Sequence, residues 1–374
     1  MNFKDRLSKQ LESRKENQSL RHLTVKPGLI DFTSNDYLGF ARSKALKNLI
    51  DDKVKELNTN GATGSRLLSG NSAYTEKVEH YLAQIFKSQN SLIFNSGYSA
   101  NLAVLSSLPQ RGDTILYDEL SHASIKDGAR LSLANRYSFR HNDLDDLESK
   151  LKTATGNAFI AVESIYSMDG DACPLEDLVT LSEKYQAQVI LDEAHSTGVI
   201  GPQGSGLSCE LHLQDKISIR VYTFGKAMGI HGAAVACDQL LRDYLVNFAR
   251  PFIYTTALSP HSITSIEMAF TYLSSHIHLQ DQAKDRVKYF NTQFTQYLAS
   301  RFTRTSLDHP IQTIVIPGND QAKGIANYLQ NKGYDIRAIL SPTVKKGEER
   351  LRICLHIYNS DDDISGLIHS LAVL

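Results

Sequence analysis

Hydrophobic and polar positions alternate in blocks between residues 91 and 224, and this pattern predicts a βαβ arrangement. The short, almost continuous apolar runs are typical of strands buried on both faces of a parallel sheet, with helices between them. The clearest helix is expected to begin at Pro174 and to bury Leu175, Leu178 and Leu181. The predicted strands are SLIFN (91–95), DTILYD (113–118), AFIAVES (158–164), QVILDE (188–193) and ISIRVYTF (217–224).

The pattern changes on either side of this block. Phe3, Leu7 and Leu11 recur at helical spacing near the start, and after about residue 280 helices alternate with strands such as QTIVIPG and RLRICLHI. We therefore expect an α/β protein, with a large domain built on a mostly parallel sheet and a smaller α+β domain. The expected limits are 1–45 for an N-terminal segment packing with the small domain, 46–280 for the large domain and 281–374 for the C-terminal small domain.

Charge and composition exclude several classes of partner. The 374 residues include 40 Lys and Arg against 41 Asp and Glu, so no net field favours nucleic acid or an anionic membrane. The first twenty residues are polar, and no window approaches the roughly 18 apolar residues of a membrane span. We expect a soluble, cytoplasmic protein.

The four cysteines indicate neither a metal site nor a redox pair. They are far apart and form no C-x-x-C motif. Cys237 and Cys354 stand in apolar, strand-like contexts (AAVAC and LRICL), where buried free thiols are common. A reducing compartment fits this pattern best.

Candidate chemistry gathers where the predicted strands end. In an open parallel sheet, ligands bind beyond the carboxyl ends of the strands. Here those ends carry a phosphate-type turn, a polar loop, an aspartate with a nearby histidine, and a lysine after a glycine, which together match the needs of pyridoxal phosphate (PLP). The segments are Asn95 to Tyr98, Ser164 to Asp169, Asp192 to His195 and Thr223 to Lys226.

Lys226 and Asp192 are the strongest single candidates. Lys226 follows an apolar strand and precedes small residues, so its amine is expected to be desolvated and nucleophilic, able to carry the cofactor as a Schiff base. The alternative is a surface lysine in a βα loop. Asp192 ends a buried-type strand, where a carboxylate can keep the cofactor's ring nitrogen protonated. The alternative for Asp192 is a helix N-cap.

Three further positions are weaker when taken singly. Ser96, Gly97 and Tyr98 open a helix directly after a strand, and backbone N–H groups there can bind phosphate, although such turns are common. His195 could bond the cofactor or a substrate carboxylate, or it could be structural. His122 could stack on the cofactor ring, or it could be an ordinary neighbour of a helix cap.

Six motifs in the same order resemble the α-oxoamine synthases over nearly the whole chain. They are SNDYLGF (34–40), NSGYSAN (95–101), LSHASIKDGA (120–129), ESIYSMDGD (163–171), DEAHSTGVIGPQGSG (192–206) and TFGKAMGIHGAAV (223–235). The resemblance implies the PLP-dependent transferase fold type I, similar to aspartate aminotransferase. It also implies a homodimer with active sites at the subunit interface.

Carried over position by position, the resemblance implies three sets of residues. The catalytic set is Lys226, His122, Asp192 and His195. The cofactor would contact Gly97, Tyr98, His122, Ser167, Asp192, His195, Thr223 and Lys226, with Thr256 reaching the phosphate in the neighbouring subunit. The substrate side would be Arg21, His122, Thr343 and Arg352, with Arg352 suited to a bidentate bond with a carboxylate.

Within the family the closest resemblance is to the biotin-pathway member. Its segments here include NFARPFIYTTALSP (247–260) and SPTVKKGEERLRI (341–353). It implies an acyltransferase that condenses L-alanine with a pimeloyl thioester, on CoA or acyl carrier protein. The alternatives are a sister synthase using glycine or serine with another acyl thioester, and a non-catalytic partner subunit. His231 stands where relatives commonly have a small residue, which leaves substrate selectivity open.

Overall fold

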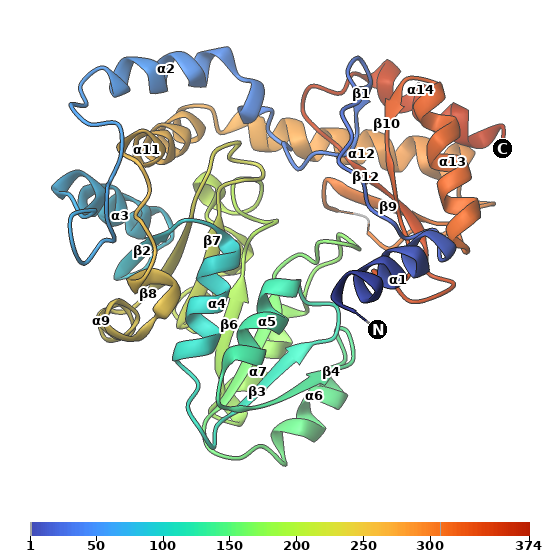
Figure 1. The fold of residues 1–374 in the computed structure, drawn as a ribbon. Coiled ribbons are helices and arrows are strands. Elements are labelled where there is room, and N and C mark those ends of the chain that lie inside the picture. Colours follow the sequence, from blue (N-terminus) through green and yellow to red (C-terminus); the bar gives the residue numbers. More distant parts are fainter. Residues whose placement is uncertain (1, 307) are drawn as a thin grey trace. The chain divides into compact units, whose positions relative to one another are not determined.

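The computed structural model describes residues 2–306 and 308–374 and divides into two compact units (Figure 1). The large unit comprises residues 35–167 and 172–282, and the small unit comprises 1–34, 168–171 and 283–374. The expected domain limits fell after residues 45 and 280, whereas contacts separate the units after residues 34 and 282 and assign the short loop 168–171 to the small unit.

A seven-stranded sheet forms the centre of the large unit, in the order β2-β8-β7-β6-β5-β3-β4. Neighbours from β4 to β7 pair in parallel, and β8 is antiparallel to both β7 and β2. The predicted α/β fold with a mostly parallel sheet is therefore confirmed. The strands are β2 (Asn90–Phe94), β3 (Thr114–Asp118), β4 (Asn135–Phe139), β5 (Ala158–Glu163), β6 (Gln188–Asp192), β7 (Ile219–Thr223) and β8 (Ala233–Cys237).

The strand that the sequence pattern missed is β4. Its first four residues are exposed and only Phe139 is buried, because β4 lies at the edge of the sheet. A polar edge strand has neither an apolar run nor an alternating pattern to reveal it. The AAVAC segment forms β8, as its apolar context indicated, and all five of its residues are buried.

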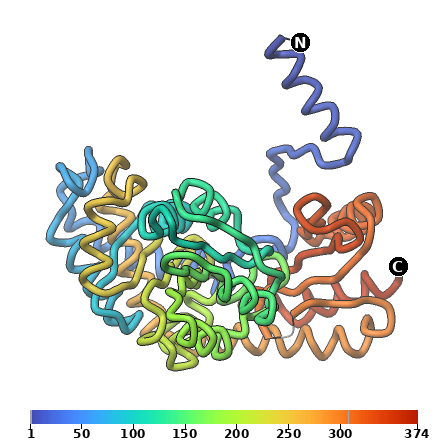
Figure 2. Tube along the Cα trace, turned by 90° about the horizontal axis from the view of Figure 1, so that it is seen from below, coloured from blue at the N-terminus to red at the C-terminus, as the bar shows by residue number. Residues whose placement is uncertain are grey.

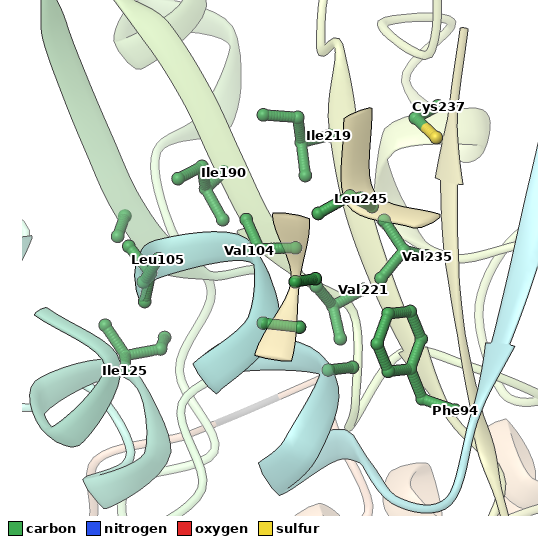
Figure 3. Close-up of a cluster of buried hydrophobic side chains, with 14 of the residues drawn as sticks. Phe94, Val104, Leu105, Ile125, Ile190, Ile219, Val221, Val235, Cys237 and Leu245 are labelled. Carbon is green, nitrogen blue, oxygen red and sulfur yellow. The ribbon is translucent and has the colours of Figure 1, made fainter. Parts of the chain in front are cut away.

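The inner strands β3, β5 and β6 contribute side chains to two separate cores. On one face Ile190, together with Phe94 and Val221, packs against Val104 of α4 (Gly97–Ser107), as Figure 3 shows. On the other face Leu191, the next residue of β6, belongs to a second core. Because both faces are covered, alternate residues of these strands are equally apolar, which explains the continuous hydrophobic runs.

Helices cover the sheet of the large unit, and most begin at side-chain caps. Ser72 caps α3, and Ser96 caps α4 through a capping box. Pro174 is the N-cap of α7 rather than its first residue, and of the three leucines expected inside, Leu181 is only partly buried. Besides α4, the large unit contains the helices α2 (Lys44–Val54), α3 (Ala73–Ile85), α5 (Ala123–Leu131), α6 (Leu144–Leu151), α7 (Leu175–Lys184), α8 (Leu207–Glu210), α9 (Gln239–Phe248), α10 (Arg250–Ile253), α11 (Pro260–Ser275) and the short helices Phe40–Arg42 and Pro202–Gly204.

The small unit has its own sheet and core. The antiparallel sheet β11-β12-β9 packs with α13 and α14, and β1 pairs in parallel with β10. In Figure 2, α1 stands out from the orange and red part of the chain, and none of its side chains is buried. The elements are α1 (Phe3–Glu16), β1 (Ile30–Asp31), α12 (His278–Tyr297, which crosses the unit boundary), β9 (Ile311–Val315), α13 (Asn319–Asn331), β10 (Tyr334–Asp335), β11 (Arg337–Ile339), β12 (Arg350–Cys354) and α14 (Asp361–Ala372).

In the part of the chain that the structure describes, no helix combines the length and apolar character needed to span a membrane. All four cysteines are buried, and no disulfide bond joins them in the part of the chain that the structure describes.

Arg220 is a charged residue inside β7 that ties the sheet to a helix end. Its side chain is 2% exposed and donates from Nη1 to the carbonyl oxygen of Phe86 at 2.7 Å and to the hydroxyl of Tyr222 at 2.8 Å. Phe86 is the C-cap of α3, where carbonyl groups lack partners within the helix and a positive charge is favourable. The guanidinium therefore supplies donors that an apolar strand residue would not.

Arg220→Met should lower the free energy of unfolding by about 2–4 kcal/mol, because it leaves buried carbonyl and hydroxyl groups without a donor. Urea denaturation followed by circular dichroism measures the change. Arg130→Met is the matched control: Arg130 is 73% exposed, and this change should stay within about 0.5 kcal/mol. Equal effects of the two substitutions would contradict the assigned role of Arg220.

Candidate functional site

A cavity of about 260 Å³ lies at the carboxyl ends of the central strands, within the large unit. Its polar groups come from strand ends and from the first residues of α4 and α5. Six of the predicted site residues line it together: Gly97, Tyr98, His122, Asp192, Thr223 and Lys226. Other lining residues are Asn35, Ser96, Asn101, Ser124, Glu163, Ala194, Gly225, His231 and Gly232.

Lys226 lies in the connection between β7 and β8, so it is not in the βα loop that the alternative interpretation required. Its Nζ lies 2.8 Å from Nε2 of His195. The other ring nitrogen of His195 lies 2.9 Å from the hydroxyl of Tyr37, which in turn donates to Asn35 at 3.0 Å. His195 is 2% exposed and Tyr37 is fully buried, so this chain of contacts holds the lysine amine in place.

Two buried carboxyl groups end neighbouring strands beside the lysine. Asp192 on β6 and Glu163 on β5 are register partners, 4% and 2% exposed. Asp192 Oδ1 accepts the N–H of Ala194 at 2.9 Å, and its Oδ2 accepts Asn101 Nδ2 at 2.6 Å. No helix starts at Asp192, so the turn contact with Ala194 does not make it a helix N-cap.

Glu163 has a different charge environment from Asp192. Its Oε1 accepts the N–H of His122 at 2.6 Å. Burial, reinforced by the charge of Asp192, raises the pKa of Glu163 from 4.5 to about 8. Glu163 therefore holds its proton at neutral pH.

Both interpretations that the sequence allowed for His122, a position at a helix cap and a position at the ligand site, apply to this residue. It is the N-cap of α5, and its Nδ1 accepts the N–H of Ser124 at 3.2 Å. It also lines the cavity, 6.4 Å from the ring of Tyr98 between centroids. Burial lowers the pKa of His122 below its ordinary value of 6.5. A neutral ring at the cavity wall is suited to stacking on an aromatic ligand.

The opposite end of the cavity is suited to an anion. The first N–H groups of α4 open onto it, and a Cβ added at Gly97 would collide with the methyl group of Thr223. The Thr223 hydroxyl is buried and has no hydrogen-bond partner among the described residues. A buried donor without a partner is costly unless a ligand satisfies it.

These groups fit PLP. The lysine amine can bond its aldehyde carbon, the Asp192 carboxylate can pair with a protonated ring nitrogen, and the α4 end with Thr223 can hold a phosphate. Within residues 2–306 and 308–374, no group of three or more metal-ligating side chains is placed to hold a metal ion.

Besides His195, which contacts Lys226, five predicted residues are not part of this cavity wall. Ser167 is buried in the loop after β5, and Thr256 is exposed after α10; among the described residues neither belongs to the lining set. Arg21, Thr343 and Arg352 belong to the small unit. Arg352 Nη1 contacts Cys354 Sγ at 2.9 Å on β12. The roles of these five residues stay predictions.

Sequence reasoning missed Tyr37, Asn101, Ser124 and Glu163. Glu163 and Asn101 lie inside motifs quoted in the sequence analysis. Glu163 also lies at the end of a predicted strand, so its position beside Asp192 could have been predicted. Tyr37 and Asn101 meet their partners 158 and 91 residues away along the chain. Such contacts leave no local pattern.

Comparison with known proteins places this geometry in a family. The model of aminotransferase class I and II matches residues 27–370. The 8-amino-7-oxononanoate synthase of Emericella nidulans is 38% identical over 99% of this chain and 95% of its own length. The Francisella tularensis 8-amino-7-oxononanoate synthase structure superposes with a TM-score of 0.80 at 29% identity, over 92% of this chain and 97% of that one.

A serine palmitoyltransferase from S. paucimobilis with a bound PLP–myriocin aldimine has a TM-score of 0.90, covering 100% of this chain and 98% of that one. At 22% identity it shows a shared fold only. The fold type I prediction and the resemblance to the α-oxoamine synthases are confirmed. The chain belongs to aminotransferase class I and II and, within it, to the 8-amino-7-oxononanoate synthase family.

Proposed function

We propose that the protein is a PLP-dependent acyltransferase of biotin biosynthesis. It condenses L-alanine with a pimeloyl thioester, on CoA or acyl carrier protein, to give 8-amino-7-oxononanoate, carbon dioxide and free thiol. The relatives that carry this name support the reaction. The observation that carries the proposal is the position of Lys226, in one cavity with Asp192, His122 and the anion-binding end at Thr223.

When bound, PLP supplies a conjugated ring that accepts electron density from the α-carbon of alanine. Lys226 would hold the cofactor covalently in the resting enzyme until the amine of alanine displaces it; the freed lysine amine would then take the proton from the α-carbon of alanine and later return one. His195 holds that amine at 2.8 Å. Asp192, whose two oxygens accept from Asn101 and the Ala194 N–H, would pair with the ring nitrogen and keep it protonated.

The other proposed cofactor contacts come from residues in and next to the cavity wall. Gly97 and the Tyr98 N–H bind the phosphate with Thr223, whose buried hydroxyl then gains a partner. His122 stacks on the ring and faces the substrate. Ser167, beyond the end of β5, bonds the ring hydroxyl together with His195.

Residues of the small unit bind the substrates. Arg352 pairs with the alanine carboxylate through its planar guanidinium, whose fork geometry matches a carboxylate. Arg21 and Thr343, both exposed, contact the acyl donor. His231 lines the cavity and bears on the choice of substrate.

The protein acts in the cytoplasm as a homodimer with shared sites. Thr256 follows the exposed Tyr254, and the next residue, Ala257, donates to the carbonyl of Gly64 at 3.0 Å. The loop that begins at Gly64 includes Leu68, whose side chain is 85% exposed. Large exposed apolar side chains on two joined loops are typical of an interface, and they would bring Thr256 to the phosphate bound by the other subunit.

Thiol release from pimeloyl-CoA should require L-alanine and should be slower with glycine or serine. Lys226→Ala should lose roughly 10²–10⁴-fold in rate or more, because the α-proton loses its base. Lys216→Ala, which changes a half-exposed lysine of the same unit, should match the wild type. Borohydride should fix PLP to Lys226. Thiol release that does not depend on the amino acid, or a label on another lysine, would contradict the proposal.

Glu163→Gln should make stability less dependent on pH in the cofactor-free protein. In the wild type, Glu163 keeps its proton up to about pH 8 when folded but loses it near pH 4.5 when unfolded, so unfolding releases a proton between these values. Stability from this group is present below pH 4.5 and is lost as pH rises to about 8, with a slope of up to about 1.4 kcal/mol per pH unit. Gln has no such titration.

Urea denaturation from pH 5 to pH 9, with each variant compared with the wild type, measures this difference. Glu176→Gln, an exposed carboxylate in the first turn of α7, is the control and should run parallel to the wild type. A Glu163→Gln curve that also runs parallel to the wild type would show that Glu163 is ionised at neutral pH.

A mixture of Lys226→Ala and Thr256→Ala subunits should be more active than either parent. If each site takes Lys226 from one chain and Thr256 from the other, a heterodimer has one site with both lesions and one intact site. The test requires Thr256→Ala alone to be impaired. Given that, exchanged subunits no more active than the two homodimers would mean that each chain builds its own site.

A further inference from the structure

A chain of buried hydrogen bonds connects Asp192 to His122 across the wall of the cavity. Asn101 Nδ2 lies 2.6 Å from Asp192 Oδ2 and 3.0 Å from Ser124 Oγ. Ser124 Oγ lies 2.8 Å from His122 Nδ1. Asn101 and Ser124 are each 1% exposed, so water does not compete for these bonds. These hydrogen bonds join β6, α4 and α5.

The charge of Asp192 fixes the orientation of the Asn101 amide. An amide nitrogen only donates, and its two protons match the two acceptors on Asp192 and Ser124. The flipped amide would place Oδ1 against the carboxylate. In the observed orientation, Asn101 Oδ1 is buried with no partner among the described residues. A buried unpaired acceptor is unfavourable, so the amide is held by the two bonds that it donates rather than by its fit to the helix core.

The orientation of Asn101 determines the proton positions further along the chain. His122 Nδ1 accepts the Ser124 N–H, so the Ser124 hydroxyl, which accepts a proton from Asn101 on one side, donates its single O–H to Nδ1 on the other. The Ser124 N–H also points at Nδ1, at 3.2 Å. Nδ1 of His122 therefore carries no proton, and a neutral ring carries its proton on Nε2.

From this arrangement we propose that Asn101 is a positioning residue, which transmits the charge of Asp192 through Ser124 and holds His122 neutral as the Nε2–H tautomer. This role rests on the proposed function, in which Asp192 pairs with the cofactor and His122 faces it. An ionised Asp192 and a neutral His122 with one defined donor thus arise from a single network. Asn101 touches neither reacting atom and acts through both neighbours.

The proposal predicts a direction for the titration of His122. Protonating Nδ1 costs the bond that the Ser124 O–H donates to it, and it leaves the Ser124 oxygen accepting from two donors, Nδ1 and Asn101. Asn101→Leu, similar in volume, removes one of these donors, so His122 should titrate at a higher pH than in the wild type, by roughly one unit. Ser124→Ala should act in the same direction, because it removes the donor that favours the unprotonated Nδ1.

Other charged groups face His122 and are kept the same in this comparison. The charges of Asp192 and Asp127 raise its pKa, and those of Lys226 and Lys126 lower it. Glu163 binds its backbone N–H from β5. Since none of these residues is substituted, a shift specific to Asn101→Leu reports the hydrogen-bond chain.

Imidazole ¹⁵N NMR of the full-length, cofactor-free chain, titrated from pH 5 to pH 9, tests this. The His122 signal is assigned by its loss in His122→Gln. Asn101→Leu and Ser124→Ala should each raise the midpoint, and the double variant should raise it no further than Ser124→Ala alone, since Asn101 acts through Ser124. Ser107→Ala is the control: Ser107 is buried on α4, and its hydroxyl donates to the carbonyl of Ala103 in its own helix. Its titration should match the wild type.

A second measurement uses the holoenzyme. Losing a hydrogen bond to a charged carboxylate should weaken PLP binding in Asn101→Leu by about ten- to a hundredfold, with Ser107→Ala unchanged. An unshifted His122 midpoint in Asn101→Leu, or additive shifts in the double variant, would overturn the proposal. If Asn101→Leu does not fold, Ser124→Ala decides, and an unshifted midpoint there would overturn it. The titration needs no turnover, so an inactive wild type would count against the proposed function alone.

Discussion

Burying two carboxyl groups side by side is the constraint on which the site depends. Glu163 and Asp192 end adjacent parallel strands, where isolated negative charge is very unfavourable. The two carboxyl groups are stabilised in different ways. Asp192 keeps its charge with one donor on each oxygen, and Glu163 takes up a proton while accepting the N–H that begins α5. Both solutions require α4 and α5 to start at fixed places against the sheet.

The same requirement organises the rest of the cavity. Because Ser96 caps α4, the helix begins at Gly97 against the Thr223 side chain, and its fifth residue, Asn101, reaches Asp192. Lys226 enters from the turn after β7 and is held by His195 and Tyr37. Positive, negative and neutral groups are thus fixed before any ligand arrives, and preorganisation of this kind lowers the cost of binding.

Much of the large unit could be predicted from the sequence, because covered strands give continuous apolar runs and their polar ends mark the ligand edge. Lys226, Asp192 and Gly97 were accessible in this way. β4 was not, since an exposed edge strand has no apolar signal. Asn101 was missed for a different reason: one polar residue in an apolar helix shows nothing of a partner on another strand. The small unit gave a clear pattern of elements, but the roles of Arg21, Thr343 and Arg352 came only from the family resemblance.

Because both faces of the sheet are covered, a change in the length of an inner strand affects both cores. Ile190 and Leu191 are neighbours that belong to opposite cores. One residue inserted within β6 would exchange the two cores and turn Asp192 to the other side of the sheet, away from Asn101. A change in length within β6 is therefore incompatible with this site, whereas the loops that connect the strands are not subject to the same constraint.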